Sequence, residues 1–191
     1  EYPLLTQVNS TIARDGIELV AKGMPVLKVP FSQAGKSKMA VKVWRDSLNA
    51  TLVGVEYDAW FSSYLKVACH LVQLSEETSR TADVNFAGEH QFVSFADGFP
   101  LLLISQNSLD DLNSRLNTPV SMARFRPNIV VSGCEAYAED TWQDFTIGRV
   151  LLKGVKNCSR CIFTTVDPKT GIKNTDVEPL KTLSGYRRRQ G

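Results

Sequence analysis

The first third of the chain is a series of short β-prone runs separated by clusters of Gly, Pro, Ser and Asn. Over residues 41–44 the two valines face one way while the lysine and the tryptophan face the other, which is the period of two of a half-buried strand. Short strands at this spacing are typical of a barrel or a sandwich. The pattern predicts four strands, at residues 17–23, 25–31, 40–46 and 50–57.

Helical periodicity appears at two places. After Asp58, a suitable helix cap, the apolar residues of 60–65 fall at helical spacing. Residues 107–116 give the clearest signal, because Ser108 and Asp111 have the spacing of a capping box and three leucines share one helix face. Further strands are predicted at 68–75, 128–133, 148–155 and 161–166, and a last helical turn near 179–187.

Residues 76–91 are polar and show no period, so we place a domain boundary near residue 76. The chain then divides into residues 1–76, a partial β-barrel, and residues 77–191. Together the elements predict a β-rich α+β fold. Because the chain starts without Met and ends in a polar cluster, we expect a piece of a longer protein, cut at both ends.

The amino-acid composition limits the classes of function that are possible for the chain. A net charge of +2, from 22 basic and 20 acidic side chains, argues against a nucleic-acid partner. No run of apolar residues is long enough for a membrane span, and four irregularly spaced cysteines predict a reducing, cytoplasmic setting. Only two histidines, His70 and His90, are available, which gives Ser-His-Asp chemistry little basis.

The most distinctive stretch is NCSRCIFTTVDP, residues 157–168, in which Cys158 and Cys161 enclose Ser159 and Arg160. A structural zinc site needs four ligands, whereas this pair supplies two. A thioredoxin-like pair would precede a long helix, but the residues that follow predict a strand. The stronger interpretations stay open: a thiolate ligand for a soft or high-valent metal, a sulfur carrier, or two cysteines that only flank a turn.

Two other stretches carry candidate binding groups. Arg124 and Arg126 alternate in RFRPNIVVSG, where Pro127 argues against a helix. In an extended segment both guanidinium groups project to one side and make a fork for phosphate or carboxylate, although a plain pair of surface arginines fits equally. Asp97 and Gly98 form a tight turn ahead of the apolar run FPLLLI.

Together these stretches resemble a MOSC-domain protein. The resemblance rests on FADGFPLLLIS with SLDDLNSRL, on RFRPNIVVSGCEAYAEDTW, and on NCSRCIFTTVDPKTG followed by EPLKTL. It is to the branch that contains the mitochondrial amidoxime-reducing components and bacterial proteins with a C-terminal ferredoxin domain. It implies a MOSC N-terminal β-barrel domain over residues 1–76, then a MOSC β-barrel with peripheral helices over residues 77–191.

The resemblance implies a molybdenum-pterin cofactor, molybdopterin, whose metal is bound by the thiolate of Cys161, the catalytic residue. It also implies six cofactor-binding residues: Asp97, Gly98, Arg126, Asn128, Ser159 and Arg160. It gives Cys158 no role as a ligand. The chain departs from the family pattern in lacking its Lys-Ser contact and an upstream arginine, and in having Phe99 where the mitochondrial members have a hydroxyl residue.

The implied activity is two-electron reduction of small N-hydroxylated substrates such as amidoximes. Electrons would come from a 2Fe-2S domain or a reductase outside this chain, so we expect that the chain by itself can lack activity. Two rival functions stay open. MOSC domains also occur in molybdenum-cofactor sulfurases, so Cys161 could carry a persulfide in a sulfur-carrier or cofactor-sulfuration module. The β-rich half could instead be a non-enzymatic docking surface for an electron donor.

Overall fold

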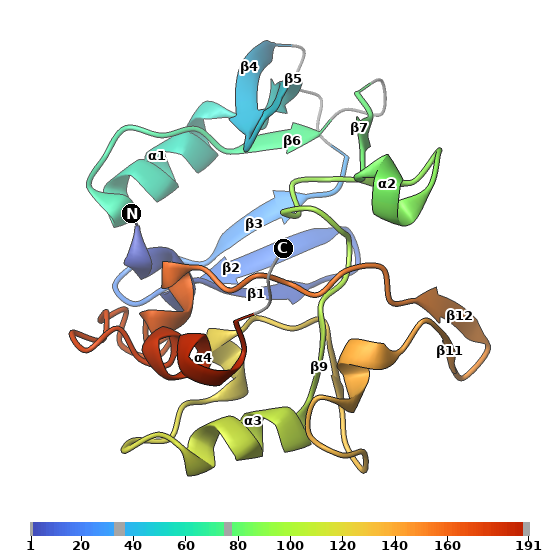
Figure 1. The fold of residues 1–191 in the computed structure, drawn as a ribbon. Coiled ribbons are helices and arrows are strands. Elements are labelled where there is room, and N and C mark those ends of the chain that lie inside the picture. The colour runs from blue at the N-terminus through green and yellow to red at the C-terminus, as the bar shows by residue number, and fades with distance from the viewer. Residues whose placement is uncertain (1, 33–36, 75–77, 189–191) are drawn as a thin grey trace. The chain divides into compact units, whose positions relative to one another are not determined.

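Small β-sheets joined by short helices make up the chain, as the sequence pattern predicts (Figure 1). The computed structural model describes residues 2–32, 37–74 and 78–188. These fold as two units. The N-terminal unit comprises Glu1–Ala82 and Glu89–Pro100, and the C-terminal unit comprises Asp83–Gly88 and Leu101–Gly191. The predicted boundary near residue 76 lies outside the described residues.

Antiparallel strands build the N-terminal unit. One sheet has the order β1-β2-β3, a second has the order β4-β5-β6, and β7 pairs with β8. Their bounds are β1 Asn9–Ile12, β2 Gly16–Val20, β3 Leu27–Pro30, β4 Lys38–Val43, β5 Asp46–Leu52, β6 Val72–Leu74, β7 Arg80–Thr81 and β8 Phe92–Val93. The strands predicted at 17–23, 25–31, 40–46 and 68–75 are confirmed as β2, β3, β4 and β6, with different bounds. The strand predicted at 50–57 is correct only over its first three residues, because β5 ends at Leu52 and residues 55–57 begin α1. Among the described residues none of the sheets closes into a barrel.

One helix of this unit begins earlier than predicted. After the short 3-10 helix η1 (Pro3–Gln7) and the strands β1 to β5, α1 runs over Val55–Leu65. Asp58 therefore lies inside α1 and does not cap it. Its carboxylate instead accepts from the Leu71 amide at 2.8 Å and pairs with His70 Nδ1 at 2.6 Å. The buried Trp60 donates from its indole nitrogen to the Pro25 carbonyl at 2.7 Å, which fixes α1 to the residues before β3.

The C-terminal unit combines short helices with two strand pairs. Its elements are α2 Val84–Ala87, β9 Leu103–Ser105, α3 Gln106–Ser114, η2 Met122–Arg124, β10 Ile129–Val131, η3 Ala138–Thr141, β11 Asp144–Ile147, β12 Val150–Lys153, η4 Ile162–Thr165 and α4 Leu180–Tyr186. β10 pairs with β9 in parallel, and β11 forms an antiparallel hairpin with β12. The predicted strands at 128–133 and 148–155 are confirmed as β10 and β12, and α4 is the predicted last helical turn.

Two local predictions in this unit are wrong. The predicted helix at 107–116 exists as α3, but its cap is Ser105, whose hydroxyl accepts from the Ser108 amide at 3.0 Å. The predicted strand at 161–166 is the 3-10 helix η4. There the hydroxyls of Thr164 and Thr165 donate to carbonyls three residues earlier, at 3.0 and 2.7 Å, and so support a helical turn despite the β-branched composition.

The core of the C-terminal unit is a cluster of Leu109, Leu112 and Phe125. The partly buried hydrophobic residues packed around it are Ile104, Leu116, Val120, Met122, Leu183 and Tyr186. α3 therefore contributes two core leucines, in agreement with the predicted apolar face. The overall composition of elements confirms the β-rich α+β class, and no helix within the described ranges is both long and apolar enough to cross a membrane.

A polar network joins α4 to α3. The Tyr137 hydroxyl donates to the Asp111 carboxylate at 2.8 Å and lies 2.6 Å from the Tyr186 hydroxyl, which donates to it in turn. Arg115 also donates to Asp111, at 2.9 Å. The bonds from Arg115 and Tyr137 lower the pKa of Asp111, whereas burial raises the pKa of Tyr137. Asp111 is thus held in its ionised form.

We expect Leu112→Ala to lower the free energy of unfolding by about 2 to 5 kcal/mol, because it leaves a cavity at a core side chain that is 3% exposed. Urea unfolding followed by circular dichroism measures this. The matched control is Leu151→Ala in β12, where the side chain is 70% exposed and the change should stay below about 0.5 kcal/mol. Equal losses for the two variants would contradict the assigned core.

We expect Asp111→Asn to destabilise the protein in a pH-dependent way. The pKa of Asp111 is lowered on folding, so its ionised form stabilises the fold above pH about 4, and this contribution is lost as pH falls through the folded value. The stability difference between wild type and variant, from urea unfolding between pH 2 and 6, should shrink on acidification. A difference that does not change with pH for Asp111→Asn would refute the network.

Candidate functional site

The candidate site in the C-terminal unit lies where two irregular segments are joined. These are residues 122–128, which carry η2, and residues 157–167, which carry the cysteine motif and η4. Arg160 donates from Nη2 to the Phe125 carbonyl at 2.9 Å, and Arg124 donates from Nη1 to the Thr165 carbonyl at 2.9 Å. The two segments are therefore cross-linked in both directions by guanidinium groups.

Cys161 has a fixed backbone and an exposed side chain. It caps η4, and its carbonyl accepts from both the Thr164 amide at 3.2 Å and the Thr164 hydroxyl at 3.0 Å. Thr164 and Thr165 of η4 are buried. Among the described residues the Cys161 thiol has no hydrogen-bond partner, so it is available to a ligand.

Arg160 is the most constrained group beside the thiols. Its Nη1 donates to Cys158 Sγ at 3.3 Å, and its guanidinium carbon lies 5.3 Å from the centre of the Phe125 ring. Its Nε is buried without a hydrogen-bond partner, and the partners of its other nitrogens among the described residues are a thiol and a carbonyl. A buried N–H left unpaired is costly, so this cation is suited to an anionic acceptor. The arginine contacts Cys158, whereas Cys161 stays open.

The two arginines that were predicted to act as a pair, Arg124 and Arg126, lie in different environments. Arg124 ends η2 with a side chain only 12% exposed, and it pairs with Asp167 at 3.3 Å in addition to the Thr165 carbonyl. Arg126 is exposed, has a left-handed backbone (φ 52°), and lies 5.8 Å from the Phe163 ring centre. The prediction that both project to one side of an extended segment is wrong, because η2 curls the chain and Arg126 departs from extended geometry before Pro127.

Asn128 is partly used by the fold. Its side-chain oxygen accepts from the backbone N–H of Leu102 at 2.9 Å, and its backbone N–H donates to the Leu102 carbonyl at 2.8 Å. These bonds fix the start of β10 beside the start of β9. The described residues leave the side-chain NH2 of Asn128 as a free donor. Ser159, in the cysteine motif, is exposed.

Asp97 and Gly98 belong to the N-terminal unit. The Asp97 carboxylate is exposed and accepts from the Trp44 indole nitrogen at 3.2 Å, and its carbonyl accepts from Arg80 Nη2 at 2.6 Å. Trp44 and Arg80 were missed by the sequence reasoning. Trp44 looked like one face of a strand, and Arg80 sat in a polar stretch without any period, so the sequence carried no signal for either contact.

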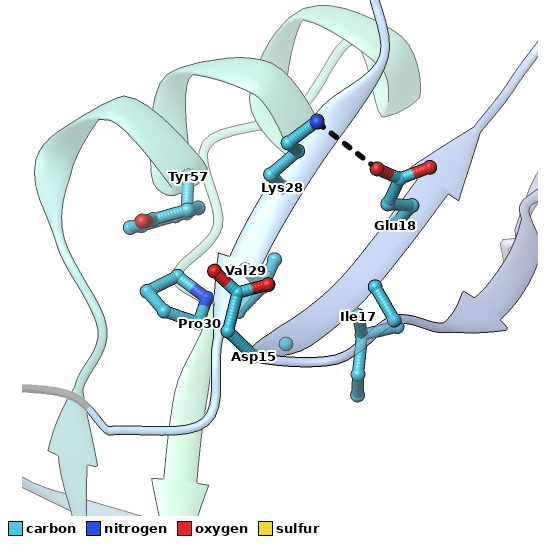
Figure 2. Close-up of a pocket in the computed structure, with 9 residues that line it drawn as sticks. Asp15, Ile17, Glu18, Lys28, Val29, Pro30 and Tyr57 are labelled. Atoms are coloured by element: carbon cyan, nitrogen blue, oxygen red, sulfur yellow. Dashed lines mark ion pairs between the residues drawn. The ribbon is translucent and has the colours of Figure 1, made fainter.

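The N-terminal unit also has an open pocket of about 320 Å³ between β2, β3 and α1 (Figure 2). Asp15 and the buried Tyr57 line it, and Lys28 and Glu18 form an ion pair of 3.1 Å at its rim. None of the residues predicted from the sequence lines this pocket. Within the described part of the chain, no three His, Cys, Asp or Glu side chains gather as a metal-ligand cluster.

Comparison with known families settles the classification. The model of the MOSC domain matches residues 90–191, more than half of the chain. The chain belongs to the MOSC family. The model of the MOSC N-terminal beta barrel domain matches residues 1–68. The resemblance drawn from the sequence motifs is thereby confirmed.

Individual relatives of this MOSC chain cover nearly all of it. The mitochondrial amidoxime reducing component 2 of rat is 41% identical over 194 residues, covering 98% of this chain and 57% of the relative. The mitochondrial amidoxime-reducing component 1 of mouse is 39% identical over 193 residues, covering 98% of this chain and 56% of the relative. The human component 1 is 55% identical over 95 residues, which is 50% of this chain and 28% of that protein. The chain thus spans little more than half the length of the first two.

Arg124 and Arg126 should respond differently to the same substitution. We expect Arg124→Lys to lower the free energy of unfolding by about 1 to 3 kcal/mol, because a lysine cannot serve both the Thr165 carbonyl and Asp167 from a buried position. Arg126→Lys, the matched control, should change it by less than about 0.5 kcal/mol. Urea unfolding of both variants measures this, and a larger loss for Arg126→Lys would reverse the assignment.

Proposed function

We propose that this chain is the cofactor-binding part of a molybdenum-dependent reductase of small N-hydroxylated compounds, with the Cys161 thiolate as the metal ligand. The observation that carries the proposal is the exposed Cys161 thiol on a pinned backbone, beside an arginine with an unpartnered buried N–H. The likeness to amidoxime-reducing components over 98% of the chain supports the choice of substrate class.

The residues present fit an anionic pterin cofactor. Arg160 offers its buried Nε, Arg126 offers an exposed guanidinium, and Asn128 offers its side-chain NH2. Charge-assisted bonds of this kind are each worth about 1.5 to 3 kcal/mol. The hydroxyl of Ser159 would line the cofactor. The cofactor contact of Asp97 and Gly98, which the family resemblance implies, stays a prediction. When bound, the cofactor supplies the two-electron chemistry that removes oxygen from the N–O group.

The chain's own residues would bind and orient the cofactor. Thr164 holds the Cys161 carbonyl through two hydrogen bonds, so the thiolate would meet the metal from a fixed backbone. The bond from Arg160 to the Phe125 carbonyl holds the guanidinium, whose Nε is buried without a partner among the described residues. Electrons would come from a 2Fe-2S domain or a reductase outside this chain. All four cysteines are unpaired, which supports the reducing, cytoplasmic setting that we propose.

The second candidate function is sulfur carriage by a Cys161 persulfide. One observation favours it: Arg160 contacts Cys158 and leaves the Cys161 thiolate free to attack the outer sulfur of a persulfide donor, whose own thiolate leaves as the sulfur is transferred. In this case no metal would be bound permanently, and the sulfur on Cys161 would be labile to thiols. Metal content and releasable sulfur therefore separate the two functions.

We expect protein made in cells that synthesise the cofactor to contain about one molybdenum per chain, and Cys161→Ala to contain almost none, because the metal–thiolate bond is lost. Elemental analysis, with pterin measured in parallel, tests this. Cys158→Ala is the matched control in the same motif and should keep its metal.

Three results would count against the proposal. A wild type without molybdenum, or a molybdenum content that is the same in wild type and Cys161→Ala, rules out the ligand assignment. Sulfide released by dithiothreitol from metal-free wild type, but not from Cys161→Ala, establishes the carrier instead. Metal without any conversion of an amidoxime to the amidine, when a reduced viologen supplies electrons, keeps the ligand and removes the substrate class.

A further inference from the structure

Cys161 stands at the start of a single helical turn. η4 has four residues, Ile162–Thr165, and Cys161 is its N-terminal cap. A 3-10 turn of this length is not stable by itself, because its few hydrogen bonds do not offset the entropy cost of ordering the chain. The hydroxyls of Thr164 and Thr165 add bonds within the turn. The rest of its stability has to come from contacts with other segments of the C-terminal unit.

Arg124 supplies such a contact at the far end of η4. Its Nη1 donates to the Thr165 carbonyl at 2.9 Å and its Nη2 to the Asp167 carboxylate at 3.3 Å, from a side chain that is 12% exposed. Thr165 is fully buried, and its carbonyl also accepts from the Asn174 backbone N–H at 2.9 Å. The fork of one buried arginine therefore fixes both the end of η4 and the residue two positions beyond it.

The residue after Arg124 holds the other side of Cys161. The Phe125 carbonyl accepts from Arg160 Nη2 at 2.9 Å, so the residue just before Cys161 is tied to the same short segment. Residues 124 and 125 thus hold the chain on both sides of the thiol, at residues 165 and 160. A metal ligand has to be kept within about 0.5 Å of its productive position by the residues that support it. This pair of contacts is suited to that task.

We infer that Arg124 is a positioning residue for the Cys161 thiolate. The inference rests on the proposed function, in which that thiolate binds molybdenum. Arg124 acts through η4, since its own donors are used by Thr165 and Asp167. A lysine keeps the positive charge but lacks the planar fork, so it cannot serve both partners. Loss of either bond frees the end of η4 and loosens the turn that holds the Cys161 backbone.

The test compares three variants of the full chain. Arg124→Lys removes the fork. Asp167→Asn removes the charge from one partner and leaves the bond to Thr165, so it stays informative if Arg124→Lys does not fold. Leu112→Ala is the control for stability, because it leaves a cavity in the core cluster while its side chain takes no part in the hydrogen bonds of η4.

The first readout is amide hydrogen exchange and uses protein made without the cofactor. The N–H groups of Thr164 and Val166 donate to the Cys161 and Phe163 carbonyls, so their exchange reports the opening of η4. In Arg124→Lys these two amides should exchange at least about tenfold faster relative to the amides of α3, because the turn opens locally. In Leu112→Ala the ratio of η4 exchange to α3 exchange should not rise.

The second readout uses protein made in cells that synthesise the cofactor. Residues that support a metal ligand typically change metal affinity by about 10- to 100-fold. Molybdenum and pterin per folded chain should therefore fall at least about tenfold in Arg124→Lys, fall less in Asp167→Asn and stay at the wild-type level in Leu112→Ala. Metal that remains in Arg124→Lys should show a displaced thiolate-to-metal absorption band, which a loss of stability alone does not change.

Three outcomes would overturn the inference. An unchanged exchange ratio in Arg124→Lys would show that Arg124 does not hold η4. Faster exchange at η4 with undiminished metal and an unmoved band would show that the hold is not needed for binding. An equal loss of metal in Leu112→Ala would show that metal content follows stability alone. In each case Cys161-dependent metal in wild type keeps the proposed function. A wild type without molybdenum removes the proposed function, and with it this role of Arg124.

Discussion

Hydrogen bonds from arginine side chains to backbone carbonyls are the constraint on which the irregular parts of both units depend. In the N-terminal unit Arg80 gathers the carbonyls of residues 94–97. In the C-terminal unit Arg124 reaches the Thr165 carbonyl and Arg160 reaches the Phe125 carbonyl. Each held segment lies largely outside the strands, where carbonyls have no ladder partner and would be costly to bury unpaired. A single fork can satisfy several of them at once.

The three arginines differ in how their charge is balanced. This difference distinguishes the arginines that stabilise the fold from the one that is suited to bind a ligand. Arg80 pairs with Asp46 and Arg124 pairs with Asp167, so each is neutralised inside the protein. Arg160 has a thiol and a carbonyl as its partners, with no carboxylate among the described residues, and one of its donors is buried and unpaired. A cation left in this state is stabilised most by an external anion. This difference supports the proposal that a negatively charged group binds beside Cys161.

The sequence was sufficient where a single local pattern decides the structure. The leucines of α3 repeat on one face and form the core, and the alternation around Val41 and Val43 marks β4. Prediction from the sequence failed where side chains form hydrogen bonds with distant or competing partners. Residues 161–166 are β-branched and predict a strand, yet the threonine hydroxyls bond backward and give η4. The contacts of Arg80 cross up to 34 residues of sequence, and no local pattern encodes them.

The same reasoning explains why two cysteines in one motif are not equivalent. Cys158 precedes the arginine and accepts its Nη1, so this thiol is occupied by a contact within the protein. Cys161 follows the arginine and stands at the point where the chain turns into η4, with its backbone bonded and its thiol exposed. The sequence alone left both thiols open to the same interpretations, because spacing does not tell which sulfur an intervening arginine will reach. A ligand that needs both a thiolate and a cationic neighbour would therefore bind at Cys161 and meet Arg160 through its free Nε, with Cys158 keeping the guanidinium in place.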